Sequence, residues 1–463
     1  MIRIVKANTS TARRAVAKLC GRLAAMEQLD SAPYRARVKA LFGKVLRPEA
    51  VVARILDDVR AHGDAALVRY AKKIDGVPLT PKNLRVSDAE RRKAAARVSP
   101  KLRAALELAA ERITDYQRRL MPADIALRAA KSGARGVKCG LAWSPLRRAG
   151  LYVPGGTAAY PSSVLMNAIP AQVAGVKELA IASPCGKDGR LSAGVLCACE
   201  ILGIREIYRL GGAQAIGALA FGTKTIRPVE KIIGPGNLFV MLAKRAVFGH
   251  VDIDMLAGPS EVLIIADSSA RADFIAADLL AQAEHDALAS CVLLTDNAAL
   301  ANAVASELKS QLATLPRKQI AEASLRDWGL IVVTKSLDAC VDLANDLAPE
   351  HLEILTRNAS SLAKQLTTAG AIFIGPHSTE PLGDYVAGPS HTLPTGGTAR
   401  AFSGLSVYSF LRRTGLIEAS AHGLHFLSDA IATLADAEGL EAHKRAVLIR
   451  TKIQNSKFKI QNY

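Results

Sequence analysis

Val262-Leu-Ile-Ile-Ala-Asp267 is a short run of branched apolar residues, and a helix-length segment, residues 272–286, separates it from a second such run at 291–295. The same alternation continues through further apolar runs at residues 330–334, 352–356 and 371–375. An earlier group of such runs lies at residues 179–183, 206–210 and 231–233. Strands separated by helix-length segments form parallel sheets with helices on both faces. The sequence therefore predicts an α/β fold with two doubly wound domains.

The first 125 residues carry helical signals instead. Ser87-Asp-Ala-Glu90 is a capping box, and Ser99-Pro100 places a capping residue before a proline at the first helical position. We expect a long helix over residues 101–120 and a helical N-terminal part of the chain.

Composition excludes several classes of protein. Of 463 residues, half are apolar and 22% are charged, as in compact globular proteins. No run reaches the roughly 18 apolar residues of a membrane span, so we expect a soluble protein with no membrane partner. The net charge is +18, but residues 1–26 and 444–463 each hold six basic residues and no acid. The remainder is too weakly charged for a nucleic-acid surface, so we expect no nucleic-acid partner.

Cysteine usage and the N-terminus suggest a cytoplasmic protein. Seven cysteines without a C-x-x-C pair are typical of a reducing compartment with buried thiols. The N-terminus lacks a secretory signal. Its Arg-rich, acid-free composition leaves organellar import open, although a basic amphipathic helix explains it better.

Three glycine-rich turns lie where strands are expected to end. They are Gly150-Leu-Tyr-Val-Pro-Gly-Gly156, Gly211-Gly-Ala-Gln214 and Gly234-Pro-Gly-Asn237. Open α/β sheets bind ligands there, and helix N-termini favour anions such as a pyrophosphate. The sequence has neither G-x-G-x-x-G nor a P-loop. Glycine at strand-to-helix turns more often only allows the turn and binds no ligand.

Two clusters of polar residues could hold a metal ion or move protons. In Asp278-Leu-Leu-Ala-Gln-Ala-Glu-His-Asp286, Gln282 and His285 are three apart and share a helix face. Such a pair can bind one metal ion, but it is more often a solvated or capping feature. Glu350 and His351 follow Pro349, which ends the preceding helix. They form a candidate acid/base pair, and a surface Glu beside a strand-capping His is an equal alternative.

Two more clusters follow. From Glu380, a segment containing Leu382-Gly-Asp-Tyr-Val-Ala-Gly-Pro-Ser-His-Thr-Leu-Pro-Thr395 lacks helix or strand periodicity. Long loops of this kind in compact proteins are usually functional. In Ala437-Glu-Gly-Leu-Glu-Ala-His443, Glu438 and His443 flank a helical turn. With no HExxH and no cysteine site, any metal must be held by scattered nitrogen and oxygen donors, which suits catalytic zinc.

In this order the clusters resemble those of the histidinol dehydrogenase family. Nine motifs carry the resemblance over about residues 45 to 445: Gly-Leu-Tyr-Val-Pro-Gly-Gly, Gly-Gly-Ala-Gln-Ala-Ile, Gly-Pro-Gly-Asn, Ile-Asp-Met-Leu-Ala-Gly-Pro-Ser-Glu, Asp-Leu-Leu-Ala-Gln-Ala-Glu-His, Ala-Pro-Glu-His-Leu-Glu, Gly-Asp-Tyr, His-Thr-Leu-Pro-Thr and Glu-Gly-Leu-Glu-Ala-His. The resemblance implies a step of histidine biosynthesis, in which L-histidinol is oxidised through L-histidinaldehyde to L-histidine. It also implies one Zn²⁺ per subunit, two NAD consumed per histidinol, and a homodimer.

Residue roles follow from the same resemblance. The implied zinc ligands are Gln282, His285, Asp384 and His443, with His443 completing the site of a dimer partner. Glu350 and His351 match the catalytic pair. The implied substrate contacts are Ser260, Gln282, His285, Glu350, His351, Asp384, His391, Glu438 and His443. The implied NAD contacts are Tyr152, Gln214 and Asn237.

The family's architecture implies two incomplete Rossmann-like domains with small terminal parts. The expected division is a helical N-terminal segment (1–44), a first Rossmann-like domain (45–129 and 260–405), a second (130–259), and a C-terminal helical domain with a basic tail (406–463). Two features depart from the family's pattern. Ser390 stands where Asn is commoner, which could shift a loop hydrogen bond. Lys452-Ile-Gln-Asn455 recurs as Lys459-Ile-Gln-Asn462, for which we have no physical account.

The expected chemistry follows from the residue types. Zinc has no accessible redox step, so NAD must take the electrons. His351 would remove the hydroxyl proton during the first hydride transfer, and Glu350 would activate the water that adds to the aldehyde. A cysteine nucleophile is disfavoured because Cys139, Cys185 and Cys291 sit in or beside apolar runs. The alternatives are a related dehydrogenase of another amino or polar alcohol, a zinc hydrolase, and a basic nucleic-acid scaffold.

Overall fold

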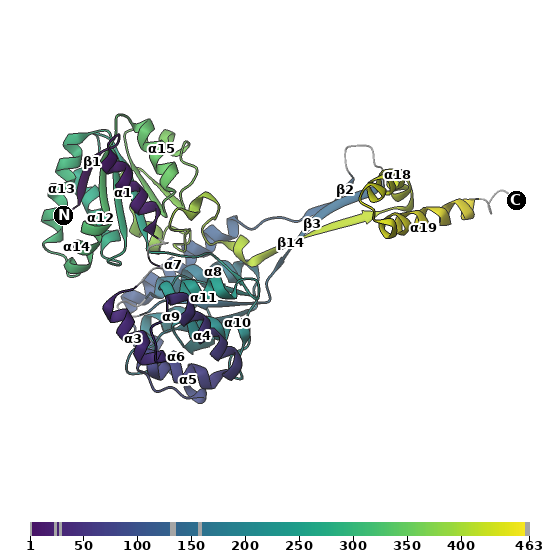
Figure 1. Ribbon diagram of the computed structural model, residues 1–463, viewed down its shortest axis with the longest axis horizontal. Helices are drawn as coiled ribbons and strands as arrows, with labels where there is room; N and C mark the ends of the chain where they lie inside the picture. Colours follow the sequence, from purple (N-terminus) through teal and green to yellow (C-terminus); the bar gives the residue numbers. More distant parts are fainter. Residues whose placement is uncertain (1, 23–25, 27–29, 130–135, 156–159, 459–463) are drawn as a thin grey trace. The chain divides into compact units, whose positions relative to one another are not determined.

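The computed structural model describes residues 2–22, 26, 30–129, 136–155 and 160–458 (Figure 1). Gly156 of the first glycine turn and the second Lys-Ile-Gln-Asn copy, 459–462, lie outside the described residues. The chain forms two compact units. Unit 1 comprises Met1–Leu120 and Leu146–Phe410, and unit 2 comprises Met121–Pro145 and Leu411–Tyr463.

Unit 1 contains a six-stranded parallel sheet of order β1-β11-β10-β9-β12-β13. Its strands are β1 (Arg3–Lys6), β9 (Glu261–Ala266), β10 (Ser290–Thr295), β11 (Gly329–Val333), β12 (His351–Leu355) and β13 (Ala371–Ile374). Its helices are α1 (Ser10–Cys20), α12 (Ala272–Ala283), α13 (Ala298–Leu312), α14 (Lys318–Asp327), α15 (Leu337–Leu347), α16 (Ala359–Ala363) and α17 (Glu380–Tyr385).

Both faces of this sheet are buried. Val262 and Ile264 of β9 pack in one apolar cluster with residues of α12, α13 and α14. Leu263 and Ile265 pack in a second cluster with residues of α1, α15 and α16. Since successive strand residues point to opposite faces, the two clusters confirm the doubly wound architecture.

Unit 1 also contains a five-stranded parallel sheet of order β6-β5-β4-β7-β8. Its strands are β4 (Arg148–Tyr152), β5 (Glu178–Ser183), β6 (Glu206–Arg209), β7 (Lys231–Ile233) and β8 (Asp252–Ile253). Its connecting helices are α8 (Pro161–Ala174), α9 (Ala193–Ile201), α10 (Gly212–Phe221) and α11 (Leu238–Val247). The N-terminal helices are α3 (Ala32–Phe42), α4 (Pro48–His62), α5 (Asp64–Tyr70), the short η1 (Ala71–Asp75) and η2 (Pro81–Asn83), α6 (Asp88–Ala95) and α7 (Pro100–Arg119).

Unit 2 is built on a three-stranded antiparallel sheet of order β14-β3-β2. Its elements are β2 (Ile125–Ala129), β3 (Val137–Pro145), β14 (Leu411–Ala419), α18 (Ala421–Ala437) and α19 (Glu441–Phe458). The small C-terminal helices expected from the sequence are present.

The packing of three segments differs from the expected division into domains. β1 pairs with β11, so the N-terminal segment is not wholly helical; a four-residue edge strand with a basic residue at each end gives almost no apolar pattern. The helices expected with the six-stranded sheet pack on the other one instead: α4 contacts α10 and α11, α6 contacts α9, and α7 contacts α8. β3 pairs with both β2 and β14, whereas β2 was expected in the first doubly wound domain and β3 in the second. Such long-range partners are set by tertiary packing, which sequence order does not reveal.

The helix caps expected from the sequence agree with the structure better than the expected domain division does. Ser87 accepts a hydrogen bond from the Glu90 N–H at 3.2 Å and caps α6. Ser99 caps α7 by accepting from the Leu102 N–H at 3.2 Å. Within the described residues, no helix combines the length and the apolar character that a membrane span requires.

Candidate active site

The candidate catalytic pair lies at the amino edge of the six-stranded sheet, where β9 and β12 begin. β9 and β12 are neighbours there, with His351 opposite Val262. Glu350 precedes β12, and its Oε2 accepts from the Glu261 N–H at 2.9 Å. His351 Nδ1 lies 3.1 Å from the Glu261 carbonyl oxygen. A carbonyl can only accept, so Nδ1 carries the proton.

This hydrogen bond leaves His351 Nε2 as the basic nitrogen. His351 is buried, and Nε2 has no hydrogen-bond partner among the described residues. It lies 3.8 Å from Oδ1 of Asp384. Burial lowers the pKa of His351, against the opposing effect of the Asp384 carboxylate. A neutral imidazole with a free lone pair is the form that a general base requires.

Burial also acts on Glu350. It raises the pKa of the Glu350 carboxyl well above its ordinary value, and the neighbouring Glu261 carboxylate raises it further. The backbone hydrogen bond from Glu261 works in the opposite direction. A carboxyl group with a raised pKa is a stronger base than an ordinary glutamate once ionised.

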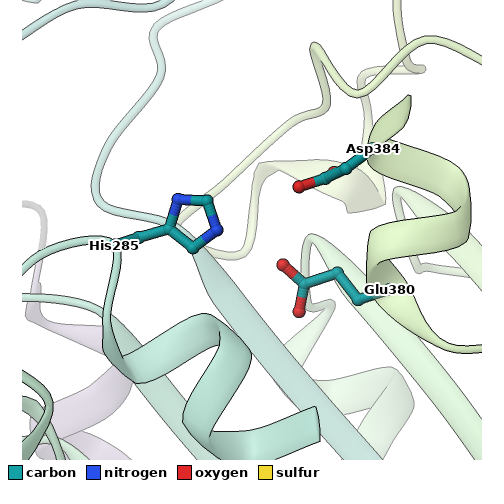
Figure 2. Close-up of side chains that lie close together, drawn as sticks. All are labelled: His285, Glu380 and Asp384. Atoms are coloured by element: carbon teal, nitrogen blue, oxygen red, sulfur yellow. The ribbon is translucent and has the colours of Figure 1, made fainter. Parts of the chain in front are cut away.

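Beside this pair, donors from α12 and α17 converge. Figure 2 shows His285 facing Glu380 and Asp384, which project from one helix. One donor atom of each of these three side chains lies within 4.8 Å of the others. Gln282 is fully buried, and its amide nitrogen faces Glu380 at 3.0 Å from Oε1, which leaves the amide oxygen for another partner. Nitrogen and carboxylate donors at this spacing can hold a divalent cation.

The segment after α17 is tied to α8, a helix of the five-stranded sheet. His391 Nδ1 lies 3.1 Å from the Asp384 carbonyl oxygen, and its Nε2 lies 3.1 Å from Ser163 Oγ. Ser390 Oγ donates to the Met166 carbonyl at 3.3 Å and accepts from the Thr392 N–H. The residue that departs from the family's pattern thus makes loop hydrogen bonds of its own.

The site residues expected from the sequence fall into two groups. Seven of them lie around this edge of unit 1: Ser260, Gln282, His285, Glu350, His351, Asp384 and His391. Ser260 directly precedes β9. Glu438 and His443 belong to unit 2, at the end of α18 and in the first turn of α19. Their part in the site stays a prediction.

Glu380 was not among the candidate donors expected from the sequence. It was expected at the start of a loop without helical periodicity, whereas residues Glu380–Tyr385 form α17. Thr379 and Pro381 at the helix start were a usable signal, because a capping residue followed by proline favours a first helical turn. Six residues are too few to show a periodic pattern.

The three glycine-rich turns border a different site, at the carboxyl edge of the five-stranded sheet. A cavity of about 900 Å³ there is lined by residues that include Tyr152, Gln214 and Asn237. Tyr152 Oη accepts from the Gly212 N–H at 3.1 Å, and Asn237 caps α11 through its Oδ1. A Cβ at Gly234 would lie 2.0 Å from the Tyr152 carbonyl oxygen, so only glycine fits. The geometry matches the ligand-binding edge of a doubly wound sheet.

Two acids, Asp75 and Asp188, line this cavity. Asp75 accepts from Gln214 Nε2 at 3.2 Å. Burial raises the pKa of Asp75 to about 6, while Arg37 and Gln214 act to lower it. Gln214 Oε1 is buried without a partner among the described residues. The end of Gln214 therefore has an acceptor available to a ligand.

Comparison with known proteins identifies the family. Residues 44–451 match the family model for histidinol dehydrogenase. The chain is 52% identical over 401 residues to a histidinol dehydrogenase of Prochlorococcus marinus, covering 87% of this chain and 89% of that protein. It is 53% identical over 411 residues to one of Moorella thermoacetica, covering 88% and 96%. A crystal structure of histidinol dehydrogenase from Elizabethkingia anophelis superimposes with a TM-score of 0.88 at 35% identity, covering 98% of this chain and 99% of that one. This chain therefore belongs to the histidinol dehydrogenase family.

Proposed function

We propose that the protein oxidises L-histidinol through L-histidinaldehyde to L-histidine, with Zn²⁺ as metal cofactor and NAD as electron acceptor. The observation that carries the proposal is the free Nε2 of buried His351 beside the donors His285 and Asp384. A base next to a cation site can act on a substrate that the cation holds.

The residues present fit a zinc ion. His285, Asp384 and the Gln282 amide oxygen supply nitrogen and oxygen donors, and Glu380 adds a carboxylate. Such mixed sets suit zinc with positions left for a substrate. When bound, the ion would hold the imidazole and amine of histidinol near His351. We include one Zn²⁺ per subunit in the proposal, with His443 reaching the site of a partner subunit in a homodimer.

In this proposal His351 and Glu350 act in different proton transfers. His351 Nε2 takes the hydroxyl proton in the first oxidation, while the Glu261 carbonyl holds Nδ1 and fixes the ring. Glu350 activates the water that adds to the aldehyde. Ser260, His391 and Glu438 contact the substrate in this proposal, and His391 is already oriented by Ser163.

The cavity on the five-stranded sheet is the proposed NAD site. Tyr152, Gln214 and Asn237 line it, and its volume of about 900 Å³ suits a cofactor. We propose a cytoplasmic enzyme.

The test is the amount of NADH formed per L-histidinol consumed by the purified protein, measured by absorbance with and without a chelator. We expect two NADH per histidinol and loss of turnover after chelation. One NADH would limit the activity to the alcohol step. Turnover of another amino alcohol in preference to histidinol would favour the related-dehydrogenase alternative, and amide or ester cleavage without NADH would favour the hydrolase.

A further inference from the structure

Glu353 is an unusual residue for the middle of a parallel strand. It is 0% exposed and lies two residues after His351, so both side chains point to the same face of the sheet. Its Oε1 accepts from the Glu380 N–H at 2.7 Å. Its Oε2 is buried without an N–H or hydroxyl partner among the described residues. A buried carboxyl group in this position needs a further explanation.

Glu353 lies beside Asp278 of α12, close enough for the Asp278 charge to act on it. Burial, and then the Asp278 charge, raise the pKa of Glu353 to about 9. Asp278 also accepts from Thr379 Oγ1 at 2.6 Å. We call Asp278, Glu353 and Thr379 the carboxyl clamp.

Each member of the carboxyl clamp belongs to an element that carries a site residue. Asp278 lies one turn before Gln282 on α12, and Glu353 shares β12 with His351. Thr379 precedes α17, which carries Glu380 and Asp384. The clamp therefore joins the three elements at the base of the candidate site.

Apolar side chains of α17 contribute little to its anchoring. The helix has six residues, all of them described, and its one buried residue is Glu380. Leu382 and Tyr385 are 40% and 55% exposed. A short helix without a buried apolar side chain gains little from packing. Its position depends on polar contacts: the clamp provides them at its first turn, and His391 contacts the Asp384 carbonyl near its end.

We propose that the carboxyl clamp is a positioning device for the metal site. It fixes the start of α17 against α12 and β12, and it thereby sets the places of Glu380 and Asp384 relative to Gln282, His285 and His351. The metal part of this inference rests on the proposed function.

The test compares Glu353→Gln with Glu353→Leu. A Gln side chain keeps an acceptor for the Glu380 N–H. Leu has a similar volume but no acceptor. The probe is Co²⁺ added to the metal-free full chain, with its affinity measured by chelator competition and its visible spectrum recorded. We expect Glu353→Gln to bind within about 3-fold of the wild type with the same spectrum. Glu353→Leu should bind about 10- to 100-fold more weakly with an altered spectrum, the usual cost of losing a group that orients a ligand.

Thr379 gives a second pair if Glu353→Leu fails to fold. Thr379→Val removes the hydrogen bond to Asp278, and Thr379→Ser retains it. We expect weaker Co²⁺ binding in the first and normal binding in the second. NADH binding to the cavity of the five-stranded sheet serves as the control for folding.

Three outcomes would overturn the inference. Equal weakening by Gln and Leu would mean that the hydrogen bond from the Glu380 N–H to residue 353 does not position the site. Unchanged Co²⁺ binding in Glu353→Leu and Thr379→Val would mean that the clamp positions nothing, while the proposed function would survive. A wild-type chain that binds no Co²⁺ would reject the metal part of the proposed function and the clamp's role with it.

Discussion

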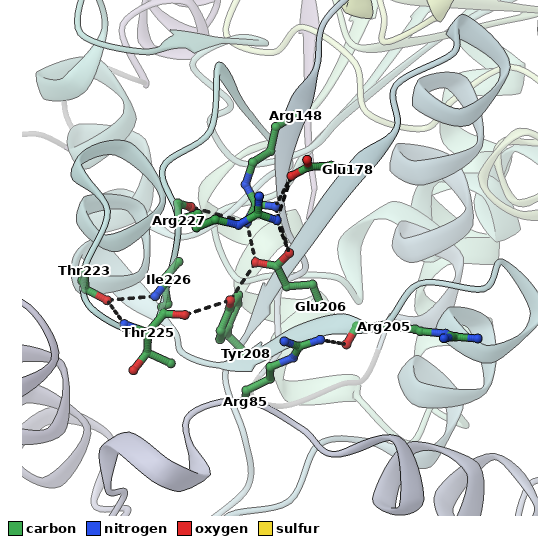
Figure 3. A network of polar contacts seen from close by, with 10 residues as sticks. All are labelled: Arg85, Arg148, Glu178, Arg205, Glu206, Tyr208, Thr223, Thr225, Ile226 and Arg227. Atoms are coloured by element: carbon green, nitrogen blue, oxygen red, sulfur yellow. Dashed lines mark hydrogen bonds and ion pairs between the residues drawn. The ribbon is translucent and has the colours of Figure 1, made fainter.

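The amino edges of the two parallel sheets carry acids in comparable places, but the acids differ in how they are paired with arginines. In the five-stranded sheet, buried Arg148 opens β4 and binds Glu178 at 3.0 Å and Glu206 at 2.8 Å (Figure 3). Arg227 adds a second contact to Glu178 at 2.8 Å. In the six-stranded sheet, Glu261 opens β9 and pairs with Arg22 at 2.5 Å.

The charge balance of the two edges explains their roles. The pKa of Glu206 is lowered because the Arg148 contacts outweigh burial. At the other edge the pKa values of Glu350 and Glu380 are raised well above normal by burial and neighbouring carboxylates. Buried charges are stable only when they are paired. The acids at the edge of the five-stranded sheet are balanced by arginines. The edge of the six-stranded sheet has an excess of acids, as the proposed cation site requires.

The largest expected effect concerns the base at the six-stranded edge. His351→Asn removes the free Nε2 and should lower kcat for histidinol oxidation by about 10²- to 10⁴-fold. Co²⁺ binding should persist, because His351 is not among the converging donors. A variant with normal kcat would remove His351 from the proposed mechanism.

The next effect tests the balanced edge. Arg148→Met leaves Glu206 and Glu178 without their buried partner, and should lower the free energy of unfolding by about 3–5 kcal/mol. Denaturant unfolding measures this change. Arg326→Met, at an exposed pair with Asp327, is the control and should change stability by less than about 1 kcal/mol. Equal losses in both variants would contradict the comparison.

Glu350→Gln should raise the free energy of unfolding, whereas Arg148→Met lowers it. It removes a buried acid from the edge with excess charge, so the metal-free protein should become more stable. It should also slow aldehyde oxidation by about 10²-fold while sparing the alcohol step, so that NADH per histidinol falls from two toward one. Equal loss of both steps would reject the role of Glu350 in activating water.

The smallest effect concerns Asp75, a partly buried acid near Arg37. It lies between the balanced edge and the edge with excess acids in its charge pairing. Its pKa is raised from 3.8 to about 6, so the folded state holds the proton more tightly than the unfolded state. The stability that this gives is fully present below about pH 4 and is lost as the pH rises through 6, a total of up to about 3 kcal/mol. Asp75→Asn should remove this part of the pH dependence and be the more stable protein at pH 7. Parallel unfolding curves of both proteins from pH 4 to 8 would contradict it.

How much could be predicted from the sequence varied with the kind of feature. Strands flanked by turns were located within a residue or two: β12 was expected at 352–356 and spans His351–Leu355. Apolar runs in parallel sheets are nearly continuous, which makes them easy to find. Gln282, His285 and Asp384 were expected to meet because the motifs resemble a known family, and they lie around one edge.

Other features were beyond local patterns. Glu353 reads as an ordinary charged residue after His351, and only its strand register places it against Asp278. Glu380 falls in a helix too short to show periodicity. The assignment of α4, α6 and α7 to the five-stranded sheet depends on which apolar faces meet, and sequence order does not encode this.

His391 engages both ring nitrogens, one with the Asp384 carbonyl and one with Ser163 on α8. β4, the strand before α8, ends at Tyr152, which lines the cavity. The His391 imidazole therefore links the proposed metal site to the proposed NAD site. Any movement of the five-stranded sheet relative to the six-stranded sheet would have to break the hydrogen bond between His391 and Ser163.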